Sequence, residues 1–105
     1  MEIHLIETNS KKEKDAFILK AKSKDMPTKK SGWQFTWRTL YKTEGAEFYK
    51  IILTDNSDNI EGMLMLSVMY DEMLYMNNIE VAPHNLGSKG KYDNVAGCLI
   101  AFGCL

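Results

Sequence analysis

The residues best suited to binding chemistry lie between Val81 and Val95. An apolar run ends at Pro83, a polar loop with two glycines follows over residues 84–91, and an apolar stretch with helical spacing begins at Tyr92. The start of a helix presents free backbone N–H groups and a partial positive charge, so it can bind a phosphate. The sequence therefore predicts an anion site here. The alternative is an ordinary strand-to-helix connection in which the glycines only permit turning.

Motifs of other catalytic classes are missing from the sequence. Neither the P-loop pattern G-x-x-x-x-G-K-[ST] nor the dinucleotide pattern G-x-G-x-x-G occurs, and there is no H-E-x-x-H or G-x-S-x-G. His4 and His84 are too isolated to predict a metal centre. Cys98 and Cys104 stand six residues apart in an apolar stretch, so we expect two buried free thiols rather than a C-x-x-C site.

The chain of 105 residues has the size of one domain, and its 45% hydrophobic content is typical of a globular fold. Its formal net charge of -1 argues against a surface that binds nucleic acid through uniform positive charge. The charge is nevertheless divided, because residues 1–45 carry 10 basic and 6 acidic side chains and residues 46–105 carry 3 and 8. The N-terminus lacks a signal-peptide pattern, and no apolar run approaches the roughly 18 residues of a membrane span, so we expect a cytoplasmic protein.

The first half of the chain predicts a strand and two helices. Residues 2–6 are apolar enough for a short strand. The pattern Ser10-Lys11-Lys12-Glu13 is a capping box, and the apolar residues that follow predict a helix over 10–24 that ends before Pro27. Residues 33–41 fit either a helix or an alternating strand, and we favour the helix.

The second half predicts a three-stranded antiparallel meander followed by a helix. Runs rich in apolar, β-branched and aromatic residues occupy 48–54, 60–69 and 73–81, with polar turns at 55–59 and 70–72. In the third run the apolar positions switch parity around Asn77-Asn78, which predicts a β-bulge there. Helical spacing of apolar residues predicts the final helix over 92–105.

Residues 60–99 resemble the GNAT superfamily of acyl-coenzyme A N-acyltransferases. That family has a bulged strand ending in a V-x-P-like segment, which Val81-Ala82-Pro83 matches, and then Q/R-x-x-G-x-G/A at a helix start. The second motif is similar to Lys91-Tyr92-Asp93-Asn94-Val95-Ala96, which is followed by the aliphatic Leu99. Lys91 stands where the family has Gln or Arg, and Asn94 where it has the first Gly. Asn is the non-glycine residue that best tolerates a left-handed backbone. The loop before Lys91 is several residues longer than the commonest spacing.

The resemblance implies an α/β (α+β) fold, with a GNAT-like antiparallel meander and flanking helices. GNAT domains usually continue with further strands and another helix. Residues 1–105 would therefore be a single domain truncated after the pyrophosphate-binding helix. That helix carries Val95, Leu99, Ile100 and Phe102 and would need cover on more than one side. We therefore expect a homo-oligomer that covers it.

The resemblance also implies an activity, the transfer of an acyl group from acetyl-coenzyme A to a primary amine of a small molecule or peptide, with no metal. Backbone amides at the helix start and Lys91 would hold the pyrophosphate, and the backbone of Ile79 and Val81 would pair with the pantetheine arm. Glu80 is the expected general base, and a solvent-facing strand residue is the alternative for it. The residues assigned to the coenzyme are Ile79, Val81, Lys91, Tyr92, Asp93, Asn94, Val95 and Ala96, and those assigned to the substrate are Asn77 and Asn78.

Two other functions fit parts of the sequence. The segment 29–42 interleaves Lys and Arg with Trp, Phe and Tyr, so it could stack on and neutralise a single-stranded nucleic acid. Such aromatic side chains more often belong to the core while the charges face solvent, which makes nucleic acid the less favoured partner. A non-catalytic binding module is the third interpretation, and the abrupt apolar end of the chain favours it.

Overall fold

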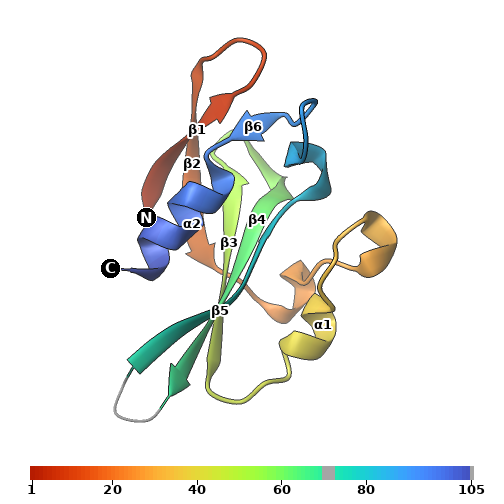
Figure 1. The fold of residues 1–105 in the computed structure, drawn as a ribbon, viewed down its shortest axis with the longest axis vertical. Helices are drawn as coiled ribbons and strands as arrows, with labels where there is room; N and C mark the ends of the chain where they lie inside the picture. Colours follow the sequence, from red (N-terminus) through yellow and green to blue (C-terminus); the bar gives the residue numbers. More distant parts are fainter. Residues whose placement is uncertain (70–72, 105) are drawn as a thin grey trace.

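The computed structural model describes residues 1–69 and 73–104, and its central feature is a curled antiparallel sheet of six strands in the order β5-β4-β3-β2-β1-β6 (Figure 1). The strands are β1 (Glu2–Glu7), β2 (Glu13–Lys20), β3 (Ala46–Leu53), β4 (Asn56–Met69), β5 (Met73–Val81) and β6 (Tyr92–Asp93). The helices are α1 (Trp37–Leu40) and α2 (Val95–Gly103), with short 3₁₀ turns at Ser23–Asp25, Lys29–Ser31 and Pro83–Asn85. The expected α+β class and antiparallel sheet are therefore confirmed.

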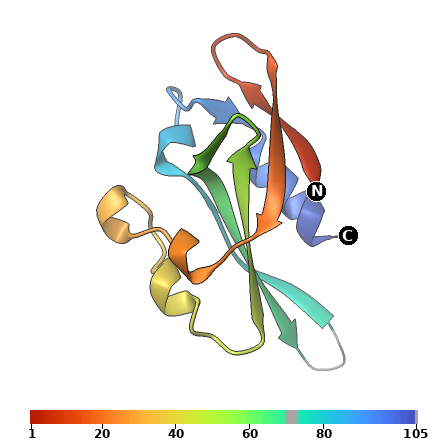
Figure 2. The ribbon, with the colours of Figure 1, turned by 180° about the vertical axis from the view of Figure 1, so that it is seen from behind.

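The sheet is buried on both faces, because different parts of the chain cover each one. In β4, Leu64 and Leu66 face one side and Met63 and Met65 face the other, and all four are buried. Helix α2 crosses the first face, and the irregular segment 21–42 packs on the second (Figures 1 and 2). Burial on both sides explains why β4 contains an unbroken apolar run rather than an alternating one.

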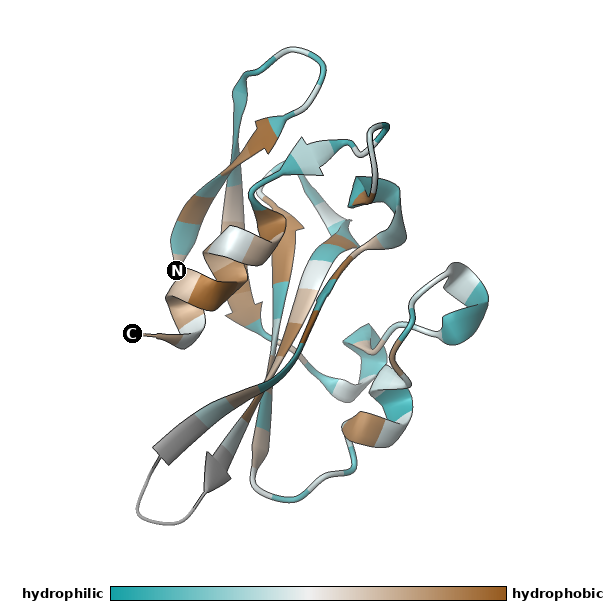
Figure 3. Cartoon of the chain, in the orientation of Figure 1, coloured by the Kyte–Doolittle hydropathy of each residue, from teal (hydrophilic) through white to brown (hydrophobic). Residues whose placement is uncertain are grey.

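The two faces carry separate hydrophobic clusters, and the apolar colouring of α2 and of the central strands in Figure 3 follows them. The α2-side core consists of Leu5, Ala16, Ile18, Ile51, Leu53, Leu64, Leu66, Val95 and Leu99. The segment-side core consists of Ala21, Met26, Trp33, Trp37, Phe48, Met63, Met65 and Ala82.

The expected helix over 10–24 is wrong, because residues 13–20 form β2. Ser10 lies in the β1–β2 turn, where its hydroxyl donates to Glu7 and accepts the N–H of Lys12, so it is not a helix cap. Lys11 has a left-handed backbone with φ of 60°, which helps to reverse the chain. A short apolar run such as 16–19 does not separate helix from strand by its periodicity alone. As a strand, β2 places Ala16 and Ile18 in the α2-side core and pairs with β1 on one side and β3 on the other.

The three-stranded meander and its bulge are confirmed. Strands β3, β4 and β5 pair consecutively and antiparallel. The register changes between Met65↔Asn78 and Leu66↔Met76, which leaves Asn77 as the extra residue of β5. The expected turn over 55–59 is longer than the observed one. Strand β4 already begins at Asn56, and the polar residues that follow belong to this strand, where its register with β3 shifts. The expected turn over 70–72 lies outside the described residues.

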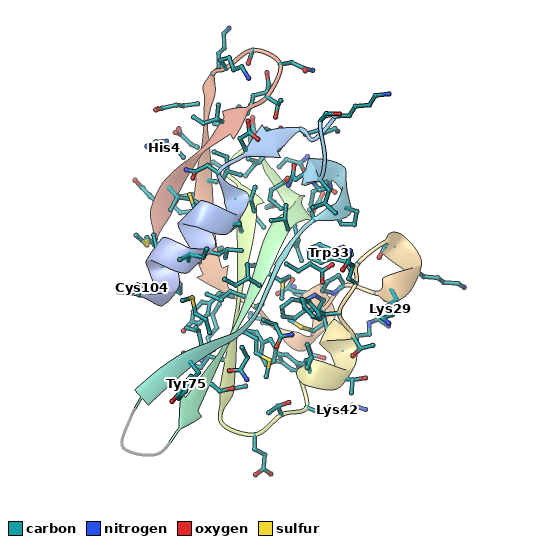
Figure 4. All side chains as sticks on the ribbon, viewed as in Figure 1. His4, Lys29, Trp33, Lys42, Tyr75 and Cys104 are labelled. Carbon is teal, nitrogen blue, oxygen red and sulfur yellow. The ribbon has the colours of Figure 1, made fainter. Side chains whose placement is uncertain are left out.

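The remaining predictions are confirmed in part. The expected first strand is β1. The helix favoured over 33–41 is shorter than expected, because only α1 forms there. The final helix begins at Val95, because Tyr92 and Asp93 pair with β1 as β6. Both cysteines are free thiols, but the expectation that both are buried is wrong. Cys98 is half-buried, and Cys104 is exposed at the end of α2 (Figure 4).

Candidate functional site

The N-terminus of α2 presents backbone N–H groups without a side-chain cap. Asn94, the residue before the helix, has a left-handed backbone with φ of 73° and makes no capping hydrogen bond. Its carbonyl accepts the N–H of Cys98 at 3.1 Å, and its side-chain amide donates to Cys98 Sγ at 3.4 Å. Because the first amides of a helix have no acceptor within the helix, they remain available to an anion. Asn94 thus has the left-handed backbone that Asn tolerates best among the non-glycine residues.

The loop 84–91 places Lys91 at the entry to α2. The N–H of Lys91 donates to the carbonyl oxygen of His84 at 3.0 Å, and the N–H of Tyr92 donates to Asn85 Oδ1 at 3.1 Å. Gly90 packs against the backbone of Asn85, since a Cβ at residue 90 would lie 2.4 Å from the Asn85 carbonyl oxygen. The Lys91 side chain is exposed and precedes α2 by four residues, with β6 between them. The loop is therefore held by its own hydrogen bonds, and it places one cation just before β6.

Close packing against β4 fixes the position of the same helix end. A Cβ at Gly62 would lie 2.7 Å from Val95 Cγ1 and 3.1 Å from Leu99 Cδ1, so a glycine lets α2 approach the strand. Val95 and Leu99 are both buried in the α2-side core. The N-terminus of α2 is therefore held rigidly next to the end of β5 that pairs with Gly62 at Val81.

Strand β5 lies at the edge of the sheet. In the described part of the chain it pairs with β4 alone, so its outer backbone groups have no strand partner. Ile79 and Val81 pack half-buried against the α2-side core, whereas Asn77 at the bulge is exposed and Asn78 is half-buried. The bulge thus lies on an edge strand, with the exposed Tyr75 beyond it (Figure 4), and the start of α2 packs on the sheet face over the neighbouring β4.

Glu80 is a buried carboxylate with three hydrogen-bond donors. Its oxygens accept the backbone N–H groups of Gln34 and Phe35, the latter at 3.0 Å, and the indole N–H of Trp37 at 2.8 Å. The residue is 9% exposed, so the alternative of a solvent-facing strand residue is wrong. This geometry anchors the segment before α1 to the sheet. A role of Glu80 as general base stays a prediction, and the anchoring competes with it.

A second buried carboxylate, which sequence reasoning missed, lies on β4. Glu61 is 2% exposed, and its Oε1 lies 2.6 Å from His84 Nε2 and accepts the side-chain amide of Asn85 at 3.0 Å. The same amide donates to the Glu61 carbonyl at 3.1 Å. One signal was visible in the sequence, a lone Glu at the start of an apolar strand. The histidine stands 23 positions away, so spacing could not connect the two.

Two cavities meet at His84. An open cavity of about 480 Å³ lies between segment 24–33 and the ends of β4 and β5, and its walls include Trp33, Asp58 and His84. A smaller one of about 180 Å³ is lined by Glu61, His84 and Lys91, among others. His84 therefore lies between the larger cavity and the entry to α2.

The pKa values of Tyr49, Tyr92 and Asp25 are shifted by their surroundings. A hydrogen bond to Glu47, together with burial, raises the pKa of Tyr49 to about 12. Burial also raises the pKa of Tyr92, and the charge of Glu61 acts in the same direction. Burial alone would raise the pKa of Asp25. The N–H of Lys22 and the ammonium of Lys50 outweigh burial and lower the pKa instead.

The basic aromatic segment 29–42 is mainly a core element. Trp33 and Trp37 are buried in the segment-side core, and only Phe35 exposes a large part of its ring, at 40%. Lys29 and Lys42 project outward while Trp33 points toward the sheet (Figure 4). The expectation that these aromatic rings belong to the core is therefore confirmed for the two tryptophans.

No family model, curated protein or solved structure matches the chain. Among the described residues, no group of three or more His, Cys, Asp or Glu side chains is placed to hold a metal ion. Neither α1 nor α2 has the length and apolar character of a membrane span.

Proposed function

We propose that the chain is an acyl-coenzyme A N-acyltransferase domain of the GNAT type, which takes acetyl-coenzyme A and acylates a primary amine. The observation that carries the proposal is the juxtaposition on β5 and α2. A bulged, unpaired edge strand leads into a helix whose first amides are uncapped and whose preceding residue, Asn94, is left-handed. A helix start of this kind suits a pyrophosphate.

The residues of this site fit the coenzyme by charge and by hydrogen-bonding capacity. The amides of Val95 and Ala96 at the helix start would donate to phosphate oxygens, and the exposed ammonium of Lys91 would offset their charge. The amide of Tyr92 is not available, because it donates to Asn85 Oδ1 and Tyr92 and Asp93 lie in β6. The outer backbone of β5 at Ile79 and Val81 would hydrogen-bond the amide-bearing pantetheine arm as an added strand would. Asn77 and Asn78 would orient polar groups of the substrate near the bulge. Bound acetyl-coenzyme A would supply the acyl group as a thioester.

The chain contributes positioning and proton transfer to this reaction. The rigid contact at Gly62 fixes the helix start, and the bulge at Asn77 fixes the direction of the strand edge. An amine acceptor carries a proton at neutral pH and must lose it before it can act as a nucleophile. The carboxylate of Glu80 accepts hydrogen bonds from three donors of segment 34–37, so we assign it the anchoring of that segment.

Titration of coenzyme A and acetyl-coenzyme A into the purified chain by calorimetry tests the proposal. We expect saturable binding that Lys91→Glu abolishes, because the substitution replaces an attraction to phosphate by a repulsion. Lys42→Glu is the matched control, since Lys42 is exposed and lies near α1, away from α2 (Figure 4). Absence of binding to the wild-type chain, or equal affinity of Lys91→Glu and the wild type, would overturn the assignment.

The rival functions receive less support from the geometry. Stacking on single-stranded nucleic acid needs exposed rings, and both tryptophans of segment 29–42 are buried. A binding module without catalysis would bind coenzyme A and transfer nothing. Assaying free thiol release from acetyl-coenzyme A with a panel of primary amines separates that outcome from the proposed transferase.

A further inference from the structure

Asn85 is a buried amide whose nitrogen and oxygen bind two different strands. The residue is 9% exposed. Its Nδ2 donates to Glu61 Oε1 at 3.0 Å and to the Glu61 carbonyl oxygen at 3.1 Å, and its Oδ1 accepts the N–H of Tyr92 at 3.1 Å. Both partners of Nδ2 are acceptors and the partner of Oδ1 is a donor, so only one orientation of the amide satisfies all three contacts. Asn85 therefore joins β4 to β6 in a fixed orientation.

The peptide group between Lys91 and Tyr92 is held from both sides. Its carbonyl oxygen accepts the N–H of Thr8 at 2.9 Å, directly after β1, and its N–H donates to Asn85 Oδ1. The N–H of Lys91 donates to the carbonyl oxygen of His84 at 3.0 Å. The backbone from which the Lys91 side chain projects is thus fixed relative to both β1 and β4.

Glu61 is the rigid end of this set of contacts. Its side chain is 2% exposed, and a carboxylate so deeply buried requires hydrogen-bond donors. His84 Nε2, 2.6 Å from Glu61 Oε1, and Asn85 Nδ2 supply them from the turn that follows β5. The contacts run from this carboxylate through the amide of Asn85 to the peptide group beside Lys91.

We propose that Asn85 is a positioning residue of the coenzyme site, which acts through the Lys91–Tyr92 peptide group and is itself oriented by Glu61. The inference rests on the proposed N-acyltransferase function, in which Lys91 offsets the charge of the pyrophosphate. Without the amide of Asn85, the N–H of Tyr92 loses its acceptor and the backbone at Lys91 is free to rotate. Coenzyme binding must then order this backbone, and the free energy of ordering lowers the affinity.

Exchanging the donor and the acceptor between residues 61 and 85 tests this role. In Asn85→Asp a second carboxylate faces Glu61, and the repulsion turns the side chain away from its position. The double variant Glu61→Gln/Asn85→Asp has the net charge of the wild type. Its amide at position 61 can donate to the carboxylate at position 85, whose other oxygen still accepts the N–H of Tyr92.

Calorimetric titration with coenzyme A measures the effect of the exchange. We expect Asn85→Asp to bind coenzyme A about tenfold more weakly than the wild type. The double variant should return to within about threefold of the wild-type affinity, because the contact between residues 61 and 85 is restored. A double variant that binds as weakly as Asn85→Asp would overturn the proposal.

Asn59→Asp is the matched control for charge. Asn59 is exposed and lines the cavity of about 180 Å³ together with Glu61 and Lys91, and its side chain makes no hydrogen bond with a described residue. This variant adds the same charge nearby without disturbing the contacts of Asn85, so the affinity should change by less than about threefold. Equal losses in Asn59→Asp and Asn85→Asp would mean that charge alone lowers the affinity, and would contradict a positioning role.

Urea unfolding monitored by tryptophan fluorescence separates positioning from stability. A folded Asn85→Asp chain that binds coenzyme A as tightly as the wild type would show that the residue is only structural. If Asn85→Asp does not fold, Asn85→Ala takes its place, because it removes the same hydrogen bonds without adding a charge. The same loss of about tenfold is expected there, and wild-type affinity would refute the inference.

Failure of this inference is distinguishable from failure of the proposed function. If the wild-type chain does not bind coenzyme A, the function and the positioning role are both refuted. If the wild type binds and the variants at Asn85 bind equally well, only the positioning role is refuted.

Discussion

Replacing Glu80 tests whether its carboxylate anchors the segment before α1. In Glu80→Ala, the N–H groups of Gln34 and Phe35 and the indole of the fully buried Trp37 lose their acceptor. A hydrogen bond to a charged group contributes about 1.5–3 kcal/mol, and a buried donor without a partner costs about 1–3 kcal/mol. Because adjacent hydrogen bonds are not additive, we expect Glu80→Ala to lower the free energy of unfolding by about 3–5 kcal/mol. That is a large part of the roughly 5–15 kcal/mol that stabilises a typical domain.

Glu80→Gln separates the shape of this side chain from its charge. The amide oxygen can still accept from Phe35 and Trp37, but the amide nitrogen then faces the N–H of Gln34, so that donor meets donor. We expect the free energy of unfolding to fall by about 1–3 kcal/mol. Glu44→Gln is the matched control, because Glu44 is an exposed loop residue and the loss there should stay within about 0.5 kcal/mol.

Urea unfolding monitored by tryptophan fluorescence measures these losses. Trp33 and Trp37 are the two tryptophans of the chain, and both lie in the segment-side core that Glu80 anchors. A loss below about 1 kcal/mol for Glu80→Ala would refute the anchoring argument. The same variants test the catalytic alternative. A general base at residue 80 requires Glu80→Gln to slow acyl transfer by about a hundredfold to ten-thousandfold at unchanged coenzyme affinity.

Substitutions at Gly62, Asn94 and Tyr49 test the packing of α2, its entry and one strand-face hydrogen bond. Gly62→Ala adds a Cβ 2.7 Å from a side-chain carbon of α2, so urea unfolding should show a loss of about 1–3 kcal/mol. Asn94→Ala should lose about 1–2 kcal/mol to left-handed backbone strain, whereas Asn94→Gly should lose much less. The pKa of Tyr49 is raised to about 12, so its contribution to stability is complete below its ordinary value of 10.0 and disappears as pH rises toward 12. The free energy of unfolding, measured across that pH range, should fall less steeply with pH in Tyr49→Phe than in the wild type.

Each of these substitutions has a comparison that could contradict it. The Cβ of Gly103→Ala would come close to the flexible and partly exposed side chain of Met76 and would lie at an ordinary contact distance of 3.6 Å from Leu66 Cδ2, so this substitution should cost less than Gly62→Ala. Equal losses would mean that the helix does not depend on its close approach to β4. Equal losses for Asn94→Ala and Asn94→Gly would mean that the left-handed backbone carries no strain. Identical pH curves for the wild type and Tyr49→Phe would contradict the shifted phenol.

The sequence predicted the meander because its signals are local. The switch of apolar parity within residues 74–81 placed the bulge around Asn77-Asn78, and the structure identifies Asn77 as the extra residue. Strands β3, β4 and β5 also follow one another in the chain. Strand β2 was mistaken for a helix because its identity depends on partners in β1 and β3, which a window of residues does not contain. The pairing of the two-residue β6 with β1 was missed for the same reason, since more than eighty residues separate the two strands.

The candidate site also has a part that local sequence signals predicted and a part that only the folded chain brings together. A helix start was predicted from the apolar spacing after the loop, although α2 begins at Val95 rather than at residue 92, and attention to Asn94 came only from the resemblance. The contacts of Glu61 with His84 and of Glu80 with Trp37 join residues 23 and 43 positions apart, so only the folded chain brings them together. Buried carboxylates are rare without partners, and a Glu within an apolar strand is therefore a signal that a partner exists without showing which one it is.

The two buried carboxylates explain how irregular chain can be held rigidly against the sheet. Glu80 lies on the segment-side face, since it pairs across the strands with Met63, and Glu61 is the extra residue of β4 at its register shift with β3. Segment 21–42 and the turn after β5 contain little regular structure, so their amide groups need acceptors that a ladder would otherwise supply. Glu80 satisfies the amides of Gln34 and Phe35, and Glu61 holds the side chains of the turn. The α2 side needs no such anchors, because a helix satisfies most of its own backbone. The open cavity beside His84 therefore lies where polar contacts, rather than apolar packing alone, hold its walls in place.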